Sequence, residues 1–164
     1  MSAKDQAAKP GSIRERNERK ILDAAEQEFV QHGYKGTSTQ AIANRAELPK
    51  ANVLYYFKSK EKLYIAVLAK IMKLWDGLLE EPGADDDPAE VLERFIRGKV
   101  EMSMEQPRAS KLFAMEIIQG APHIRDYIES DMRAWVETKA ARLKGWMNAG
   151  KMDEVDPEQL IFMI

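Results

Sequence analysis

The chain has 164 residues, of which 45% are hydrophobic and 32% charged, and its formal net charge is −2. It contains no cysteine, which excludes disulfides and thiolate metal sites, and no apolar run approaches the ~20 residues of a membrane span. We therefore expect a cytoplasmic protein of one or two small domains, with no membrane partner.

Charge is divided unevenly along the chain. Residues 1–63 contain 12 Lys and Arg against 8 Asp and Glu, a net charge of +4, whereas residues 64–164 carry −6. A basic head on an acidic remainder is typical of a small DNA-binding domain joined to a domain that does not bind DNA. We expect a flexible basic arm over 1–12, a first domain over 13–60 and a second helical domain over 61–164.

The first predicted helix starts near residue 13 and ends before Gly33. Its buried stripe consists of Ile21, Ala25 and Phe29, at i, i+4 and i+8. The basic residues at its start suit either phosphate contacts or ordinary surface charge, and the pattern does not separate the two.

Two short helices with a tight turn are predicted next, over residues 37–57. Thr37 and Gln40 have the spacing of a capping box, and Pro49 ends the first of these helices. Val53 and Phe57 bury one face of the second helix. This is the geometry of a helix-turn-helix that reads a DNA groove, although a helical hairpin inside a bundle has the same pattern.

The exposed face of the second short helix has the chemistry of a DNA contact. A cation suits phosphate or guanine, an amide suits adenine, and tyrosine hydroxyls suit phosphate. We predict groove contacts from Lys50, Asn52 and Tyr55, and phosphate contacts from Thr37, Tyr56 and Lys60.

Helical spacing continues to the end of the chain, and no sustained strand pattern appears, so the predicted fold is all-α. The helix that begins at Lys60 and continues to Leu79 is expected to link the two domains. Asp87-Pro88 and Asp156-Pro157 have the residues of helix starts, and Gly120-Ala121-Pro122 predicts a sharp break. The apolar run 160–164 has no C-cap, so we expect a fragment or a shortened protein.

No catalytic signature occurs in the sequence, so we expect no enzyme, no cofactor and no metal site. The triplet Asp85 to Asp87 is predicted to be a solvated loop. The segment 112–122 is mostly apolar but places Glu116 and Gln119 three residues apart on one helical face. This pattern suits either a pocket for a small planar polar ligand or a core helix with a polar outer face.

Several motifs resemble the DNA-binding domain of the TetR family of repressors. They are Gly-Tyr-Lys-Gly-Thr-Ser at 33–38, Ile-Ala at 42–43 and Lys-Ala-Asn-Val-Leu-Tyr-Tyr-Phe-Lys-Ser-Lys-Glu-Lys-Leu-Tyr at 50–64. The resemblance implies a homodimer that binds double-stranded operator DNA through two reading helices about 34–36 Å apart. Glu47 and Pro49 depart from the family pattern, which usually has Gly and a capping Ser or Thr there.

The second domain resembles the pyrimidine-utilisation repressors within this family, through Arg-Ala-Ser-Lys-Leu-Phe-Ala-Met-Glu at 108–116, Gln-Gly-Ala-Pro at 119–122 and Asp-Pro-Glu-Gln-Leu-Ile-Phe-Met-Ile at 156–164. The resemblance implies that uracil or thymine binds here and releases the operator. Another small amphipathic effector, or a helical interaction module without operator function, remains an alternative. The predicted ligand-binding residues are Trp75, Phe113, Glu116 and Gln119.

Overall fold

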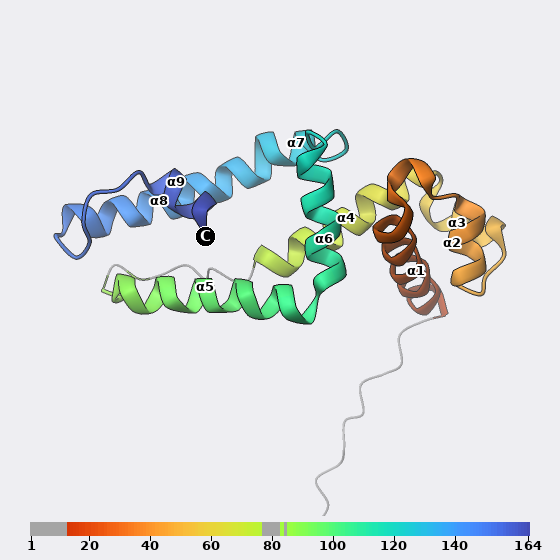
Figure 1. Ribbon diagram of the computed structural model, residues 1–164, viewed down its shortest axis with the longest axis horizontal. Helices are drawn as coiled ribbons and strands as arrows, with labels where there is room; N and C mark the ends of the chain where they lie inside the picture. Colours follow the sequence, from red (N-terminus) through yellow and green to blue (C-terminus); the bar gives the residue numbers. More distant parts are fainter. Residues whose placement is uncertain (1–12, 77–82, 84) are drawn as a thin grey trace, which may run out of the picture. The chain divides into compact units, whose positions relative to one another are not determined.

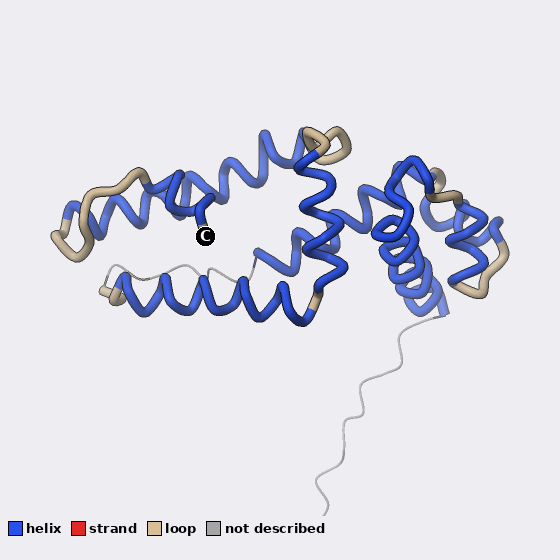
Figure 2. Tube along the Cα trace, viewed as in Figure 1, coloured by secondary structure: helices blue, strands red, loops and turns tan. Residues whose placement is uncertain are grey.

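The computed structural model describes residues 13–76, 83 and 85–164, without the side chains of residues 75 and 76. Across these ranges the fold is helical with no strand, which confirms the predicted all-α class (Figures 1 and 2). The predicted arm, 1–12, and the last residues of the predicted linking helix, 77–79, lie outside the described residues. The helices are α1 (Ile13–Gly36), α2 (Thr39–Arg45), α3 (Lys50–Phe57), α4 (Lys60–Asp76), α5 (Pro88–Glu105), α6 (Pro107–Ile118), α7 (Arg125–Tyr127), the π-helical segment η1 (Ile128–Met132), α8 (Arg133–Asn148) and α9 (Pro157–Met163).

The chain divides into two compact units, Met1–Val67 and Leu68–Ile164, and the division falls within α4. Unit 1 contains α1 to α3 and the first half of α4. Unit 2 contains the remaining helices. Each unit has its own buried apolar residues, as expected for two small domains.

The core of unit 1 forms around the buried stripe of α1. Ile21, Ala25 and Phe29 are fully buried, as predicted from their spacing. The ring of Phe29 meets the ring of Tyr64 on α4 edge to face, with centroids 4.7 Å apart. Gly33 leaves the helical conformation, with φ 69° and ψ 174°, so the regular part of α1 is broken where the sequence predicted its end.

The N-terminus of α2 is capped one residue later than predicted. The Oγ of Ser38 accepts a hydrogen bond of 3.1 Å from the Ala41 N–H, and Ser38 is therefore the N-cap. The Gln40 amide donates to Asn44 along the helix instead of returning to the cap. The capping box predicted from Thr37 and Gln40 is wrong, because Thr37 turns inward and leaves the capping role to Ser38.

The turn from α2 to α3 places Glu47 in the left-handed region, with φ 55°. The Glu47 N–H donates to Asn44 O at 3.2 Å, and the Leu48 N–H donates to Ala43 O at 3.0 Å. This pair of bonds is the Schellman arrangement, whose left-handed position favours glycine. A residue with a Cβ costs about 1–2 kcal/mol there.

Two helices of unit 2 begin with an aspartate N-cap followed by proline. Asp87 caps α5 and Asp156 caps α9, each followed by proline at the first helical position, which confirms both predicted signals. Gly120 and Ala121 both have positive φ and produce the predicted break after α6. The core joins α5, α8 and α9; its buried residues are Val91, Phe95, Val136, Ala140, Leu143, Trp146 and Ile161.

The predicted long helix after Pro122 is divided into three segments. A short α7 passes into the π-helical segment η1, and regular α-helix resumes only at Arg133. A π-helical turn contains an extra residue per turn, so it displaces the side chains that follow relative to a regular helix. Periodicity in the sequence did not reveal this insertion.

Replacement of Glu47 by glycine is expected to stabilise the protein. Glycine removes the left-handed strain but loses more conformational freedom on folding, so the net gain should be about 1 kcal/mol. Chemical denaturation measures this gain. Glu47→Ala retains a Cβ and should give no such gain; an equal gain from both substitutions would show that the carboxylate, and not the backbone, is unfavourable.

Candidate functional sites

Helix α3 presents a polar outer face above a buried one. Val53 and Phe57 are buried on its inner side, and Lys50 and Tyr55 are exposed. Pro49 precedes the helix and provides no side-chain cap. The N-terminus of α3 therefore combines a positive helix dipole end with a nearby lysine, which is an arrangement suited to a phosphate backbone.

Lys60, at the start of α4, binds the end of α1 and the loop that leads to α2. Its Nζ donates to Tyr34 O at 2.9 Å and to Thr37 O at 3.0 Å, and lies 4.5 Å from the centre of the Tyr34 ring. The Thr37 side chain is only 3% exposed, and its hydroxyl faces Glu28 O at 3.0 Å and Gly33 O at 2.8 Å. The loop between α1 and α2 is thus held by the Lys60 ammonium of α4 and by the Thr37 hydroxyl, which bonds to the main chain of α1.

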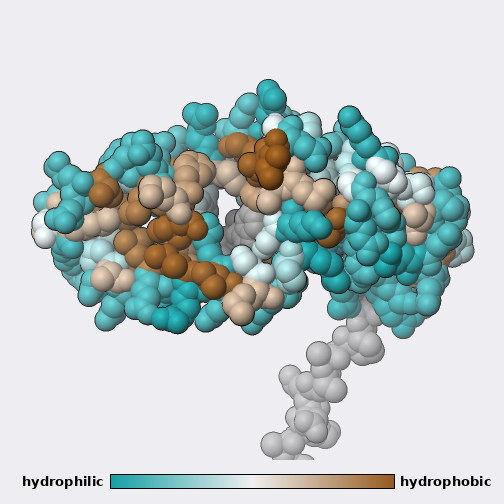
Figure 3. Space-filling model, in the orientation of Figure 1, coloured by the Kyte–Doolittle hydropathy of each residue, from teal (hydrophilic) through white to brown (hydrophobic). Residues whose placement is uncertain are grey.

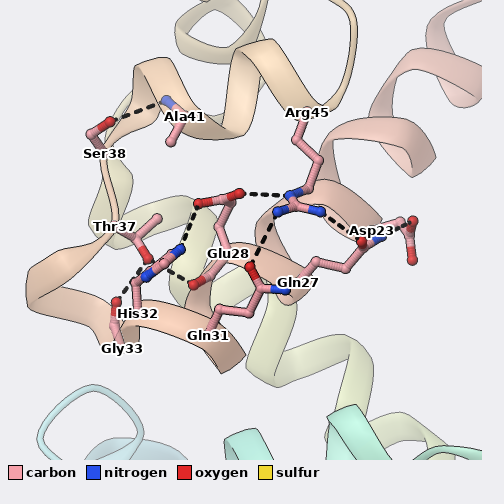
Figure 4. A network of polar contacts seen from close by, with 10 residues as sticks. All are labelled: Asp23, Gln27, Glu28, Gln31, His32, Gly33, Thr37, Ser38, Ala41 and Arg45. Carbon is pink, nitrogen blue, oxygen red and sulfur yellow. Dashed lines mark hydrogen bonds and ion pairs between the residues drawn. The ribbon is translucent and has the colours of Figure 1, made fainter.

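A polar network joins α2 to α1 (Figure 4). The Nε of Arg45 lies 2.6 Å from Oε1 of Glu28, whose side chain is 8% exposed. The two terminal nitrogens of Arg45 donate to Gln27 at 3.1 Å and to Gln31 at 3.2 Å. The guanidinium therefore contacts three side chains of one helix, and this fixes the position of α2, from which α3 continues.

Unit 2 contains a cavity of about 250 Å³. Apolar side chains gather on the face of unit 2 between α5 and the α8–α9 pair (Figure 3). Phe162, at 68% exposed, and Ile117, at 42% exposed, also line the cavity, so it reaches the surface of this chain. Its lining is Met72, Phe95, Lys99, Phe113, Ile117, Tyr127, Met132, Trp135, Val136, Ile161 and Phe162.

Comparison with known proteins identifies the family. Residues 21–67 match the family described as bacterial regulatory proteins, tetR family, and residues 68–164 match the C-terminal region of YcdC-like protein. The HTH-type transcriptional regulator RutR of Escherichia coli (strain K12) is 44% identical over 144 residues, which are 88% of this chain and 68% of that protein. The chain belongs to the TetR family of transcriptional regulators.

Solved structures of similar fold agree with the TetR assignment. A HlyIIR mutant aligns with TM-score 0.71 and 27% identity over 92% of this chain and 81% of that one. A putative fatty acid metabolism regulator from Clostridium perfringens aligns with TM-score 0.74 and 26% identity, over 88% and 78% of the two chains. TetR regulators bind operator DNA and small-molecule effectors, typically as dimers, and this chain is accordingly a transcriptional regulator and not an enzyme.

Five of the six residues predicted to contact DNA remain candidates in this TetR regulator. Lys50 and Tyr55 are exposed on α3, and Asn52 and Tyr56 are half-buried beside them. Lys60 is half-buried, with its ammonium on two backbone carbonyls. Thr37 differs from the prediction, because its hydroxyl is buried and bonded to the main chain of α1, which leaves it no proton for a phosphate.

The three predicted ligand-binding residues whose side chains the structure describes are not gathered around one space. Phe113 lines the cavity. Glu116 is 1% exposed but turns to His123, accepting its backbone N–H at 2.7 Å and lying 3.2 Å from its Nδ1, and Gln119 is exposed. Glu116 and Gln119 therefore do not form one polar face toward a ligand, because Glu116 is buried against the turn after α6 while Gln119, the C-cap of α6, is exposed. Trp75 lies on α4, and its side chain is outside the described part of the structure.

Sequence reasoning missed the residues that distinguish the cavity. Tyr127 and Met132 flank or end the π-helical segment, and Trp135 follows it by one turn. Lys99 lies one turn after Phe95 on α5, and burial lowers the pKa of its ammonium below the ordinary value. Its basic residue type alone gave no signal, since a lysine on an amphipathic helix usually faces water.

The remaining acidic and apolar features have local roles. Within the described residues, no helix is long and apolar enough to cross a membrane, and no group of three possible ligands could hold a metal ion. Asp86 accepts the Gly83 N–H at 2.7 Å, and Asp87 caps α5. The acidic triplet thus organises its own loop.

Substitution of Arg45 by methionine is expected to destabilise unit 1 by about 2 kcal/mol, since it leaves the buried Glu28 carboxylate without its cation. Urea denaturation followed by circular dichroism measures this loss. Arg97→Met is the matched control, because Arg97 and Glu93 are also 2.6 Å apart but both are largely exposed. The control should change stability little; equal losses would mean that burial of Glu28 is not the cause.

Proposed function

We propose that this TetR-family chain is a repressor that acts as a homodimer on operator DNA and is released by a pyrimidine, uracil or thymine, to control pyrimidine catabolism. The 44% identity to RutR over 88% of this chain carries the proposal. The resemblance of residues 108–164 to pyrimidine-utilisation repressors supplies the ligand. The aromatic lining of the cavity supports a flat ring as the effector.

In the proposed complex, α3 enters the major groove. Lys50, Asn52 and Tyr55 face base edges, while Tyr56 and Lys60 face phosphates. An amide bonds adenine through two complementary hydrogen bonds, and a lysine suits guanine. Two copies related by a two-fold axis read two half-sites about one helical turn apart.

Helix α4 is the proposed connection between effector and operator. It carries Lys60, bonded to the loop before α2, and Met72, which lines the cavity. A pyrimidine releases DNA only if it binds more tightly to the conformation in which the two reading helices no longer fit the operator. The proposal therefore requires differential affinity and not merely occupancy.

Release by uracil is the direct test of the proposed function. Fluorescence anisotropy on DNA from upstream of the chain's own gene should give tight, salt-sensitive binding that uracil weakens, because phosphate contacts release counterions and the effector favours the other state. The same DNA with a scrambled half-site is the control. Specific binding that ignores uracil and thymine would remove the pyrimidine and retain the repressor.

Asn52→Ala is expected to relax the choice of base at one position of each half-site. Loss of a two-bond contact to adenine should cost about 1–3 kcal/mol against the preferred base, with little change for the other bases. A competition assay over all four bases at each position measures this. Thr138→Ala, an exposed change on α8, is the control. Uniform weakening across all sequences would reassign Asn52 to the backbone.

A further inference from the structure

One wall of the cavity combines an aromatic pair with a cation. Phe95 is 2% exposed, and its ring centre lies 6.4 Å from that of Trp135 at an angle of 44°. Lys99 follows Phe95 by one helical turn, and its Nζ lies 5.1 Å from the centre of the Phe95 ring. The ammonium is therefore fixed beside the flat surface that a planar ligand would contact.

Lys99 is placed where water solvates it poorly. Lys99 is half-buried, and burial lowers the pKa of its ammonium below the ordinary value. Among the described lining residues, Lys99 is the one with a formal charge. A half-buried ammonium has lost part of its hydration, so a hydrogen bond to a ligand acceptor stabilises it. The stabilisation is largest when the acceptor is an anion.

A second lysine lies next to the aromatic pair, although it does not itself line the cavity. Lys139 on α8 is 7% exposed, and its Nζ lies 5.9 Å from the centre of the Trp135 ring. The two ammonium groups thus flank the Phe95–Trp135 pair, one on each ring. Within the described part of the chain, no ion pair joins either of them to a carboxylate, and of the two only Lys99 lines the cavity, so its charge is available to a ligand there.

We infer that Lys99 is the specificity-determining residue of the cavity, and that it selects a planar ring whose edge presents oxygen acceptors, as the carboxylate of an aromatic acid or the carbonyl oxygens of a pyrimidine dione do. The inference rests on the proposed effector site and defines what that site accepts. A lysine has three donors and no acceptor. It therefore forms hydrogen bonds with a ligand edge that presents oxygen acceptors and cannot bond to an edge that presents amino hydrogens.

Helices α5 and α8 supply the rings and the cation of this wall. Phe95 and Lys99 are four residues apart, so a regular helix places both on one face. Trp135 reaches the same wall after the π-helical segment, whose extra residue per turn changes the direction of the side chains that follow. The two rings thus come from two different helices, α5 and α8, and the charge comes from α5.

Isothermal titration calorimetry on the full chain tests the inference with benzoate, benzamide and uracil. Benzoate and benzamide have nearly the same shape, but only benzoate is an anion. The wild type should prefer benzoate by about tenfold, as expected for a charged hydrogen bond. Lys99→Met retains the length of the side chain and should abolish that preference, whereas Lys99→Arg retains the cation and should keep most of it.

Lys111→Met removes a cation from an exposed position on α6 and is the matched control, which should keep the wild-type preference. Thermal unfolding of each variant checks that it folds. If Lys99→Met does not fold, the ratio of benzoate to benzamide affinity in the wild type and in Lys99→Arg still tests the inference. A wild type that does not prefer benzoate, or a Lys99→Met variant with the wild-type ratio, overturns the inference.

Uracil separates this inference from the proposed function. Uracil binding that weakens about tenfold in Lys99→Met supports both. A benzoate preference that depends on Lys99, with no uracil binding, supports the inference and overturns the pyrimidine proposal. Uracil binding that Lys99→Met leaves unchanged overturns the inference and leaves the pyrimidine proposal standing.

Discussion

Arg45 reaches from α2 to the nearly buried carboxylate of Glu28 on α1, and this contact restrains α2, from which the chain continues into α3. Unit 1 is small, so its apolar core is limited and polar contacts between α1 and α2 add to its stability. The guanidinium binds three side chains of α1 at once, which restrains both rotation and translation of α2. Helix α3 follows after a turn of four residues. The polar contact that restrains α2 therefore lies several residues away from any predicted DNA contact on α3.

Unit 2 has a closely packed apolar core at one part of α5 and a cavity at another. Trp146 and its neighbours close α5 against α8 and α9, whereas the Phe95–Trp135 wall borders the cavity. The indole N–H of Trp146 is buried in this packed end and has no hydrogen-bond partner among the described residues. The packed end can thus hold the helices together while the other end leaves room for an effector.

The Glu116–His123 contact shows how a plausible ligand residue can instead have a structural role. A buried carboxylate requires partners, and the His123 backbone N–H and ring supply them across the turn after α6. The turn already uses positive φ at two successive residues, Gly120 and Ala121. The carboxylate therefore stabilises a strained connection next to the cavity, and Phe113 on the same helix is the side chain that lines it.

The sequence by itself determined the helices, most of their ends and the family. Helical periodicity identified the buried stripe of α1, and Asp-Pro pairs located the starts of α5 and α9, because both signals depend on neighbours within a few residues. The choice of Ser38 over Thr37 as cap, the π-helical segment and the cavity lining depended on tertiary contacts. Lys99 and Trp135 are 36 positions apart, and Arg45 meets Glu28 across 17, so no local pattern could bring them together. Only the packing of whole helices decided which polar residues bind each other and which line the cavity.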